Sequence, residues 1–137
     1  MTEEAAGMPR PPRRILLVED DRFQRKAAEA KLRARGFDVV LAEDGEEALQ
    51  ALAGPVRPDL VLLDLIMPKL SGFEVLRRLK EDPATAGIPV IVLSNLGQKS
   101  DIERATAAGA VDYLVKATAS LRDLIARVEA TLAGNRP

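Results

Sequence analysis

The chain has 137 residues, of which 47% are hydrophobic and 30% are charged, and its formal net charge at pH 7 is −1. These values are typical of one soluble globular domain, and the near-neutral charge gives no argument for binding to nucleic acid or to an acidic membrane surface. The sequence contains no cysteine and no histidine, which excludes disulfides, thiol nucleophiles, Ser-His catalysis and metal sites made of thiolates or imidazoles.

The two ends of the chain differ from the rest in composition. Residues 1–12 are rich in Glu, Ala and Pro and lack the apolar centre of a signal peptide, so we expect a disordered N-terminal tail. Residues 134–137 are expected to form a short C-terminal tail, which leaves one domain over 13–133. No stretch approaches the ~20 apolar residues of a membrane span, and a cytoplasmic protein is therefore expected.

The first half of the chain predicts three strand–helix units. Continuous apolar runs, such as the one from Ile15 to Val18, fit strands that are buried on both faces of a parallel sheet. The first helix is expected to turn Phe23 and three alanines (27, 30 and 34) inward and to be capped by Gly36. In chain order the elements are a strand over 14–19, a helix over 22–35, a strand over 37–42, a helix over 44–53, a strand over 59–63 and a helix from Ser71 to just before Pro83.

The second half predicts two further units of the same kind. A strand over 88–93 precedes a helix that begins at a capping box of Ser100 with Glu103 and ends at Gly109. A strand over 110–115 follows. The last helix has an apolar stripe at helical spacing, made of Leu121, Leu124, Ile125, Val128 and Leu132.

Five such units in series predict a three-layer α/β fold, in which a doubly wound, five-stranded parallel sheet carries helices on both faces. No Gly-x-Gly-x-x-Gly follows a strand and no Gly-x-x-x-x-Gly-Lys loop is present, which argues against a dinucleotide or P-loop nucleotide site. The flavodoxin-like strand order 2-1-3-4-5 is therefore preferred.

Polar residues follow each of the five predicted strands. The order 2-1-3-4-5 makes the first and third strands neighbours, so Asp20, Asp21 and Asp64 are expected to meet at one edge of the sheet. Three adjacent carboxylates repel one another and favour a bound cation, for which Mg²⁺ is well suited. Read separately, Asp20 and Asp21 would cap the next helix, but that interpretation leaves Asp64 unexplained.

Two further side chains reach the same edge and suggest a chemistry. Lys116 follows the fifth strand, and Ser94 follows the fourth, although Ser94 taken singly is better explained as a turn residue. Three aspartates and one lysine leave a formal charge of −2, which one divalent cation would cancel. If one aspartate were phosphorylated, the cation, Lys116 and Ser94 could stabilise the added oxygens without any imidazole.

With these residues in this order, the chain resembles a receiver domain of bacterial two-component response regulators over 13–133. The shared features are the acidic pair Asp20-Asp21, the segment Asp64-Leu65-Ile66-Met67-Pro68-Lys69-Leu70-Ser71-Gly72, Ser94 after the fourth strand, and Lys116 shortly after Tyr113. The resemblance is to a stand-alone, chemotaxis-regulator-like receiver.

The resemblance implies a role for each of these residues. Asp64 would accept a phosphoryl group from the phosphohistidine of a sensor histidine kinase, and Lys116 and Ser94 would bind the phosphoryl oxygens. Ser94 and Tyr113 would act as the conformational switch. The metal, Mg²⁺ with Mn²⁺ as an alternative, would be held by Asp21, Asp64 and the backbone carbonyl of Ile66, with Asp20 acting through a water molecule.

The same resemblance implies a signalling module that assists its own phosphorylation and dephosphorylation and is not an enzyme in the ordinary sense. Its output would be binding to a target protein, or transfer to a histidine phosphotransfer domain, through the face formed by the helix from Ser100, the fifth strand and the last helix. A phosphorylation-dependent dimer is a further option, and no nucleic acid or membrane partner is expected.

Two features leave alternatives open. Receivers usually have a cis proline after the lysine, whereas this chain has Ala117, so a pseudo-receiver that binds a partner without phosphorylation stays open. A Mg²⁺-dependent phosphohydrolase with an aspartyl nucleophile is a less favoured alternative. Such an enzyme would need a second acid two residues after the first, where this chain has Ile66. In receivers, the side chains two residues after the phosphoacceptor and two residues after the switch hydroxyl flank the path of the hydrolytic water. Because Ile66 and Leu96, at these positions, are both apolar, the resemblance implies a longer lifetime of the phosphoryl group than in fast-cycling chemotaxis receivers.

Overall fold

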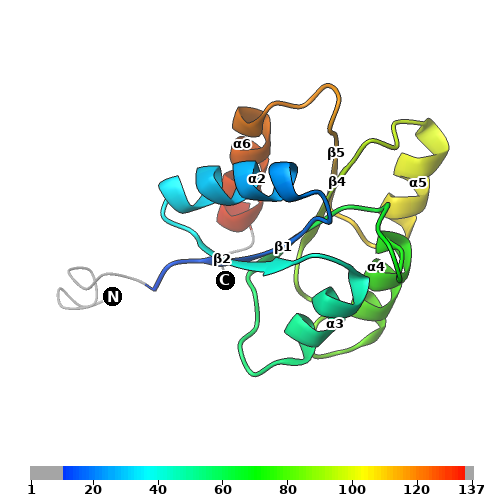
Figure 1. Cartoon of the computed structure of the whole chain (residues 1–137). Helices are drawn as coiled ribbons and strands as arrows, with labels where there is room; N and C mark the ends of the chain where they lie inside the picture. Colours follow the sequence, from blue (N-terminus) through cyan, green and yellow to red (C-terminus); the bar gives the residue numbers. More distant parts are fainter. Residues whose placement is uncertain (1–10, 135–137) are drawn as a thin grey trace.

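In the computed structural model, which describes residues 11–134, strands and helices alternate along the chain (Figure 1). The strands are β1 (Arg14–Val18), β2 (Asp38–Ala42), β3 (Leu60–Leu63), β4 (Val90–Ser94) and β5 (Asp112–Val115). The helices are α2 (Arg22–Ala34), α3 (Gly45–Ala53), α4 (Gly72–Glu81), α5 (Lys99–Ala107) and α6 (Leu121–Gly134). The expected tails fall largely outside the described residues, although Gly134 still belongs to α6.

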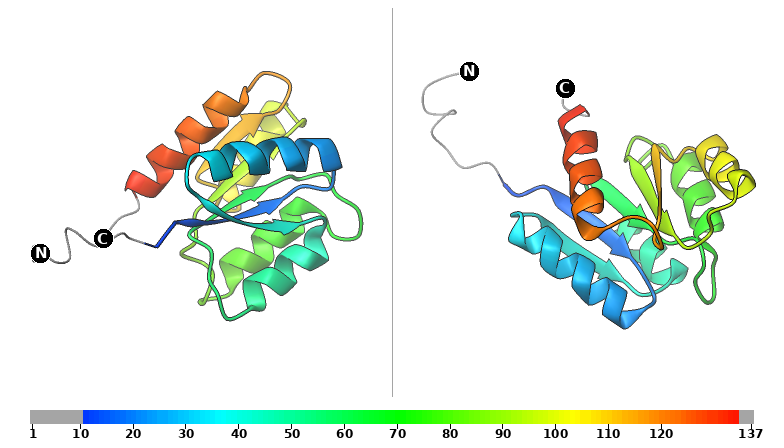
Figure 2. Two further views of the ribbon diagram at one scale, coloured as in Figure 1. Left: turned by 60° about the vertical axis from the view of Figure 1, so that its left-hand side comes forward. Right: turned by 90° about the horizontal axis from the view of Figure 1, so that it is seen from above.

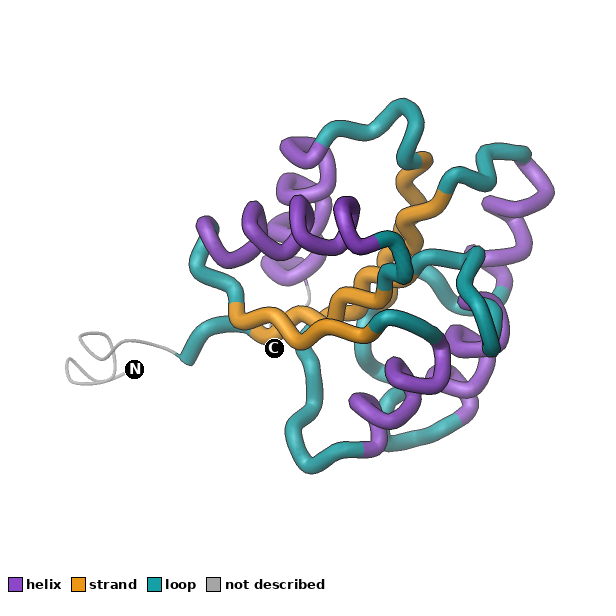
Figure 3. Tube along the Cα trace, in the orientation of Figure 1, coloured by secondary structure: helices purple, strands orange, loops and turns teal. Residues whose placement is uncertain are grey.

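The five strands form one parallel sheet in the order β2-β1-β3-β4-β5, which confirms the predicted flavodoxin-like topology. In register, Val18 of β1 lies beside Leu63 of β3, and Ser94 of β4 lies beside Val115 of β5. The strands therefore end at a common edge, and Figure 3 shows them at the centre of the molecule with helices around them. The residues that follow β1, β3, β4 and β5 meet at this edge.

Helices cover both faces of the sheet and make the three layers visible in Figure 2. Helices α2 and α6 cover one face, where the buried side chains of Leu32, Leu124 and Val128 pack against Ile15 and Leu62. Helices α3, α4 and α5 cover the other face with a second buried cluster. Four of the five residues in the apolar stripe predicted for the last helix are buried, namely Leu124, Ile125, Val128 and Leu132, and Leu121 is partly buried against the same cluster.

The inner face predicted for the first helix is wrong. Phe23 is 85% exposed, and the buried residues of α2 are Arg25, Ala28 and Leu32. Both sets have helical spacing, but the observed set contains the one large aliphatic side chain of the helix, Leu32, whose burial stabilises more than that of alanines. An arginine in a buried stripe is unusual.

The predicted start of α5 is also wrong. Gln98, and not Ser100, precedes the helix, and the capping box joins Gln98 with Asp101. Gly36 after α2 and Gly109 after α5 have positive φ angles of 88° and 112°, as expected for helix ends. Among the described residues, no helix has the length and apolar character needed to cross a membrane.

Candidate functional site

Three carboxylates converge where β1 and β3 end. One oxygen from each of Glu19, Asp20 and Asp64 lies within 4.8 Å of the other two. Pairing of the strands causes this convergence, because the backbone N–H of Asp64 donates to the carbonyl of Val18 at 3.1 Å. We call these three residues the acidic cluster.

Asp64 lies at the centre of the site and is only 6% exposed. Its Oδ1 accepts a hydrogen bond from the backbone N–H of Ile66 at 3.2 Å, and its Oδ2 accepts one from Lys116 Nζ at 3.0 Å. Both oxygens of the carboxylate are therefore oriented by donors. The Ile66 side chain projects outward and is exposed.

Lys116 bridges two members of the acidic cluster. Its ammonium group donates to Glu19 Oε1 as well as to Asp64 Oδ2, and its side chain is largely buried. Burial acts to lower the pKa of Lys116, but its hydrogen bonds to Glu19 and Asp64 outweigh burial and hold this pKa above its ordinary value. The lysine is a fixed positive charge at neutral pH.

The peptide bond between Lys116 and Ala117 is trans, like every other peptide bond of the described residues. Because Ala117 stands where receivers usually have proline, the sequence alone does not decide between a cis and a trans bond here. Lys116 Nζ reaches Asp64 in the trans loop, so the position of the ammonium group does not depend on a cis bond.

The structure corrects the expected acidic trio by one residue. Asp21 is exposed and caps α2, since its Oδ1 accepts the backbone N–H of Gln24 at 2.9 Å, and it lies outside the acidic cluster. Glu19 joins Asp20 and Asp64 instead, and its Oε2 accepts the backbone N–H of Asp21 at 3.1 Å. Because β1 ends at Val18 and α2 begins at Arg22, the last acid of the run becomes the helix cap.

Ser94 is the last residue of β4 and Tyr113 is the second residue of β5, and both contact Leu96 in the loop after β4. Ser94 is fully buried, and its Oγ accepts the backbone N–H of Leu96 at 3.3 Å, as a turn-forming serine does. The hydroxyl of Tyr113 donates to the carbonyl of Leu96 at 2.5 Å. Partial burial raises the pKa of Tyr113 above its ordinary value, so its hydroxyl stays protonated and able to donate.

The β3–α4 loop folds tightly over Asp64. The N–H of Gly72 donates to the carbonyl of Leu65 at 3.0 Å, and a Cβ atom on Gly72 would lie 2.1 Å from the carbonyl oxygen of Asp64. Lys69, at φ 69°, lies within 3.3 Å of Asp44 through its Nζ. These contacts fix the path of the loop that carries Ile66. Neither Asp44 nor Lys69 was expected to support the site, because an ion pair between residues far apart in the chain leaves no signal in a single sequence.

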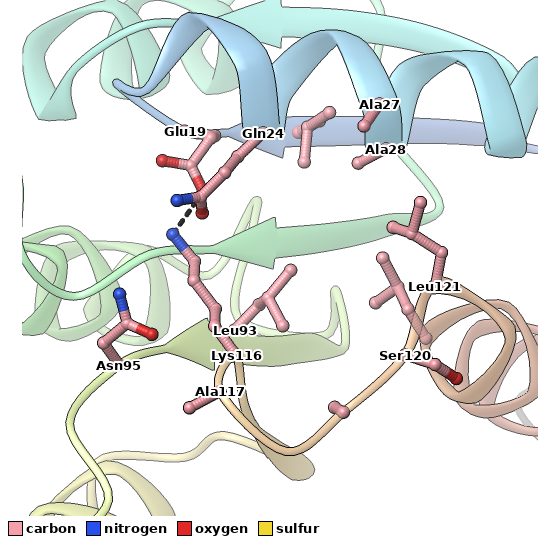
Figure 4. Close-up of a pocket in the computed structure, with 13 residues that line it drawn as sticks. Glu19, Gln24, Ala27, Ala28, Leu93, Asn95, Lys116, Ala117, Ser120 and Leu121 are labelled. Carbon is pink, nitrogen blue, oxygen red and sulfur yellow. Dashed lines mark hydrogen bonds and ion pairs between the residues drawn. The ribbon is translucent and has the colours of Figure 1, made fainter.

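A cavity of about 330 Å³ opens beside the acidic cluster (Figure 4). Its polar end is formed by Glu19, Lys116 and Asn95, and its apolar part lies between α2 and the segment that joins β5 to α6. Glu19 and Lys116, which are in contact, both line this cavity, whereas Asp20 and Asp64 do not.

The acidic cluster has the donor chemistry of a magnesium or manganese site. Its three carboxylates are hard oxygen donors, Asp20 is exposed to solvent, and the sequence contains no cysteine or histidine that could supply a thiolate or imidazole ligand. Lys116 supplies one positive charge against three negative ones, so a further cation would reduce the remaining repulsion.

Comparison with known proteins identifies the family. The family model of the response regulator receiver domain matches residues 15–129. The chain belongs to this family. Receiver domains are signalling modules and not enzymes in the ordinary sense.

Relatives of known sequence and structure agree with this assignment. The chain is 43% identical over 119 residues to the DNA-binding dual master transcriptional regulator RpaA of Synechocystis, covering 87% of this chain but 48% of that relative. It therefore spans about half the length of this curated relative. The receiver domain of a Francisella response regulator superposes with a TM-score of 0.83 at 30% identity, covering 90% of this chain and 99% of the other.

A second structure bears on the metal. The receiver domain of a sensor histidine kinase from Pseudomonas aeruginosa superposes with a TM-score of 0.80 at 30% identity, covering 89% of this chain and 98% of the other. In that protein a magnesium ion is coordinated in the active site cleft.

Proposed function

We propose that this receiver domain, over residues 13–133, accepts a phosphoryl group on Asp64 from the phosphohistidine of a sensor histidine kinase. The observation that carries the proposal is the position of the Asp64 carboxylate, which is buried between Lys116 Nζ and the carboxylates of Glu19 and Asp20. A nucleophile in this position needs no general base, because an ionised carboxylate attacks directly.

In the proposed transfer, an oxygen of Asp64 attacks phosphorus, the bond between phosphorus and the donor's imidazole nitrogen breaks, and imidazole leaves with that electron pair. Lys116 is 3.0 Å from Asp64 Oδ2 and is placed to offset charge on the phosphoryl oxygens. Ser94, buried at the end of β4, would donate its hydroxyl hydrogen to one of these oxygens. Release to water would regenerate Asp64.

The residues that would hold Mg²⁺ or Mn²⁺ are Asp20, in the place expected for Asp21, together with Asp64 and the backbone carbonyl of Ile66. Glu19 takes the place expected for Asp20. The bound cation would neutralise negative charge on the carboxylates and on the transferred group. The carboxylate chemistry of the acidic cluster supports this assignment, as does the magnesium ion in the similar receiver from Pseudomonas aeruginosa.

The proposed output is a change in partner affinity on the face formed by α5, β5 and α6. Ser94 and Tyr113 are the proposed switch, and both contact the same residue, Leu96, in the loop before α5. Movement of Ser94 toward a phosphoryl group would break its contact with the Leu96 N–H and shift the balance between two loop conformations. The proposed partners are a target protein or a histidine phosphotransfer domain.

Incubation with acetyl phosphate and Mg²⁺ tests the proposal, with intact-protein mass spectrometry to detect the added phosphoryl group. The unmodified chain should gain one group, and Asp64→Asn should gain none. Asp59→Asn is a matched control, because Asp59 precedes the same strand and its carboxylate contacts Arg14 at the opposite edge of the sheet. This control should label like the unmodified chain.

The two rival functions give different results in the same experiment. A pseudo-receiver would gain no phosphoryl group with or without Mg²⁺. A phosphohydrolase would release inorganic phosphate from free phosphate esters over many turnovers. Either outcome would contradict the proposal.

A further inference from the structure

Arg25 lies on the buried face of α2, where helical spacing predicts an apolar side chain. It shares the buried face of the helix with Ala28 and Leu32 and is 9% exposed. Burying a guanidinium group costs several kcal/mol unless its donors are matched by acceptors. The acceptors of Arg25 therefore indicate what the residue stabilises.

Those acceptors are the backbone carbonyls of the two consecutive residues of the acidic cluster. Arg25 Nη1 donates to the carbonyl of Glu19 at 2.9 Å and to the carbonyl of Asp20 at 3.2 Å. On the other side of the same loop, the N–H of Glu19 donates to the carbonyl of Ala42 in β2 at 3.0 Å. The peptide groups on both sides of Glu19 are thus held, which limits the directions its carboxylate can take.

The far end of the guanidinium group reaches another loop. Arg25 Nη2 lies 3.2 Å from Glu43 Oε1, in the segment between β2 and α3. The Glu43 side chain is 61% exposed, so this pair contributes little to stability by itself. Its effect is to orient the guanidinium plane, so that Nη1 points at the two carbonyls.

We infer that Arg25 is a positioning residue for the metal site: by holding the carbonyls of Glu19 and Asp20, it aims their carboxylates toward Asp64. Arg25 itself touches neither the metal nor the phosphoryl group. The inference rests on the proposed function, because it requires that the acidic cluster bind Mg²⁺. The inference adds a residue from the buried face of α2 to a site whose other residues lie at the ends of strands.

The test compares Mg²⁺ affinities by isothermal titration calorimetry in Arg25→Met, Arg25→Lys and Arg33→Met. Methionine keeps the apolar stem but removes every donor, so Arg25→Met should weaken the affinity about 10-fold, as loss of an outer-shell partner does. Lysine has one ammonium group in place of a planar fork, so Arg25→Lys should weaken it by about 3-fold.

Arg33→Met is the matched control. Arg33 also lies in α2, donates to a backbone carbonyl, that of Val39 at 3.0 Å, and pairs with a glutamate, Glu29. Val39 lies near the start of β2, at the edge of the sheet opposite to the acidic cluster. Thermal denaturation should show a loss of stability in Arg33→Met, but its Mg²⁺ affinity should stay within about twofold of that of the unmodified chain, since the metal site is untouched.

Each result separates the inference from the proposed function. If the unmodified chain binds no Mg²⁺, the proposed function fails. If it binds Mg²⁺ and the Arg25→Met variant binds it equally well, Arg25 does not position the site. Should Arg25→Met fail to fold, Arg25→Lys decides, because an affinity equal to that of the unmodified chain would overturn the inference.

Discussion

Three consecutive acids after β1 divide between two tasks. Glu19 and Asp20 turn toward Asp64, whereas Asp21 caps α2. Glu19→Gln removes a charged oxygen donor and should weaken Mg²⁺ binding about 10-fold. Asp21→Asn should leave the affinity unchanged and also preserve the helix cap, since asparagine caps helices as well as aspartate does.

Calorimetric titration of both variants measures this difference. If Asp21→Asn lost more affinity than Glu19→Gln, Asp21 would be the ligand and the placement of the acidic run would be wrong. Thermal denaturation in the absence of metal provides the control for folding.

Two apolar side chains follow the reactive residues at the same spacing. Ile66 comes two residues after Asp64, and Leu96 comes two residues after Ser94. Apolar side chains cannot hydrogen-bond to a water molecule that attacks the phosphoryl group, so we expect phosphorylated Asp64 to lose its phosphoryl group slowly. Ile66→Asn should accelerate this loss about 10-fold by orienting the water.

The rate of phosphoryl loss is measured from the decay of the phosphorylated protein in the presence of Mg²⁺. Val56→Asn replaces another exposed apolar side chain, in the segment between α3 and β3, and should not change the rate. Decay of the unmodified protein within seconds would contradict the expectation.

At the scale of helices and strands, the sheet was predictable because its strands are continuous apolar runs that alternate with helical segments. Strand order then placed Asp64 and Lys116 correctly at one edge. Helix faces and loops were less predictable. Phe23 suggested one face of α2, but contact with the sheet selected another that contains Arg25. A single sequence does not contain the contacts that make this selection, namely two backbone carbonyls and Glu43.

The β3–α4 loop requires glycine at its end. A Cβ atom on Gly72 would lie 2.1 Å from Asp64 O and 2.6 Å from Leu65 Cα, both of which are backbone atoms that cannot rotate away. Gly72→Ala should therefore lower the free energy of unfolding by about 1–3 kcal/mol or more, as overpacking does. Gly134→Ala, where no atom lies within 4 Å, is the matched control. Urea unfolding that showed equal stability for both variants would contradict this account of the loop.

Helix α4 contains a glutamate whose ionisation is linked to folding. The hydrogen bond from Arg77, together with that from Arg78, lowers the pKa of Glu74 from 4.5 to about 2. Because the pKa is lower in the folded state, the stabilisation is present above pH 4.5 and is lost as the pH falls toward 2.

Glu74→Gln should thus lower the midpoint of urea unfolding at neutral pH. The difference in midpoint between this variant and the unmodified chain should shrink steadily as the pH falls from 4.5 toward 2. Glu103→Gln is a control in α5, where Glu103 has a single longer contact of 3.7 Å with Lys99. A Glu74→Gln difference that grew in acid would show that the sign of the linkage is wrong.

At the scale of the whole molecule, the acidic cluster exists only in the folded chain. Asp64 is brought to Glu19 by pairing of β1 with β3, and Lys116 is brought to both by β4 and β5 between the two helical layers. In the unfolded chain these charges are far apart. Mg²⁺ should consequently bind the folded state and have little affinity for the unfolded one.

Mg²⁺ should therefore raise the melting temperature of the whole domain. Preferential binding stabilises by about 2.7 kcal/mol when the free ion is at about 100 times its dissociation constant, and the shift should grow with the logarithm of the Mg²⁺ concentration. Asp64→Asn should lose most of the shift in melting temperature, because it removes the central carboxylate of the acidic cluster. KCl of equal ionic strength should not reproduce the shift. If Mg²⁺ raised the melting temperature of Asp64→Asn as much as that of the unmodified chain, the stabilisation would not come from the acidic cluster. It would then come from ions bound elsewhere or from non-specific screening.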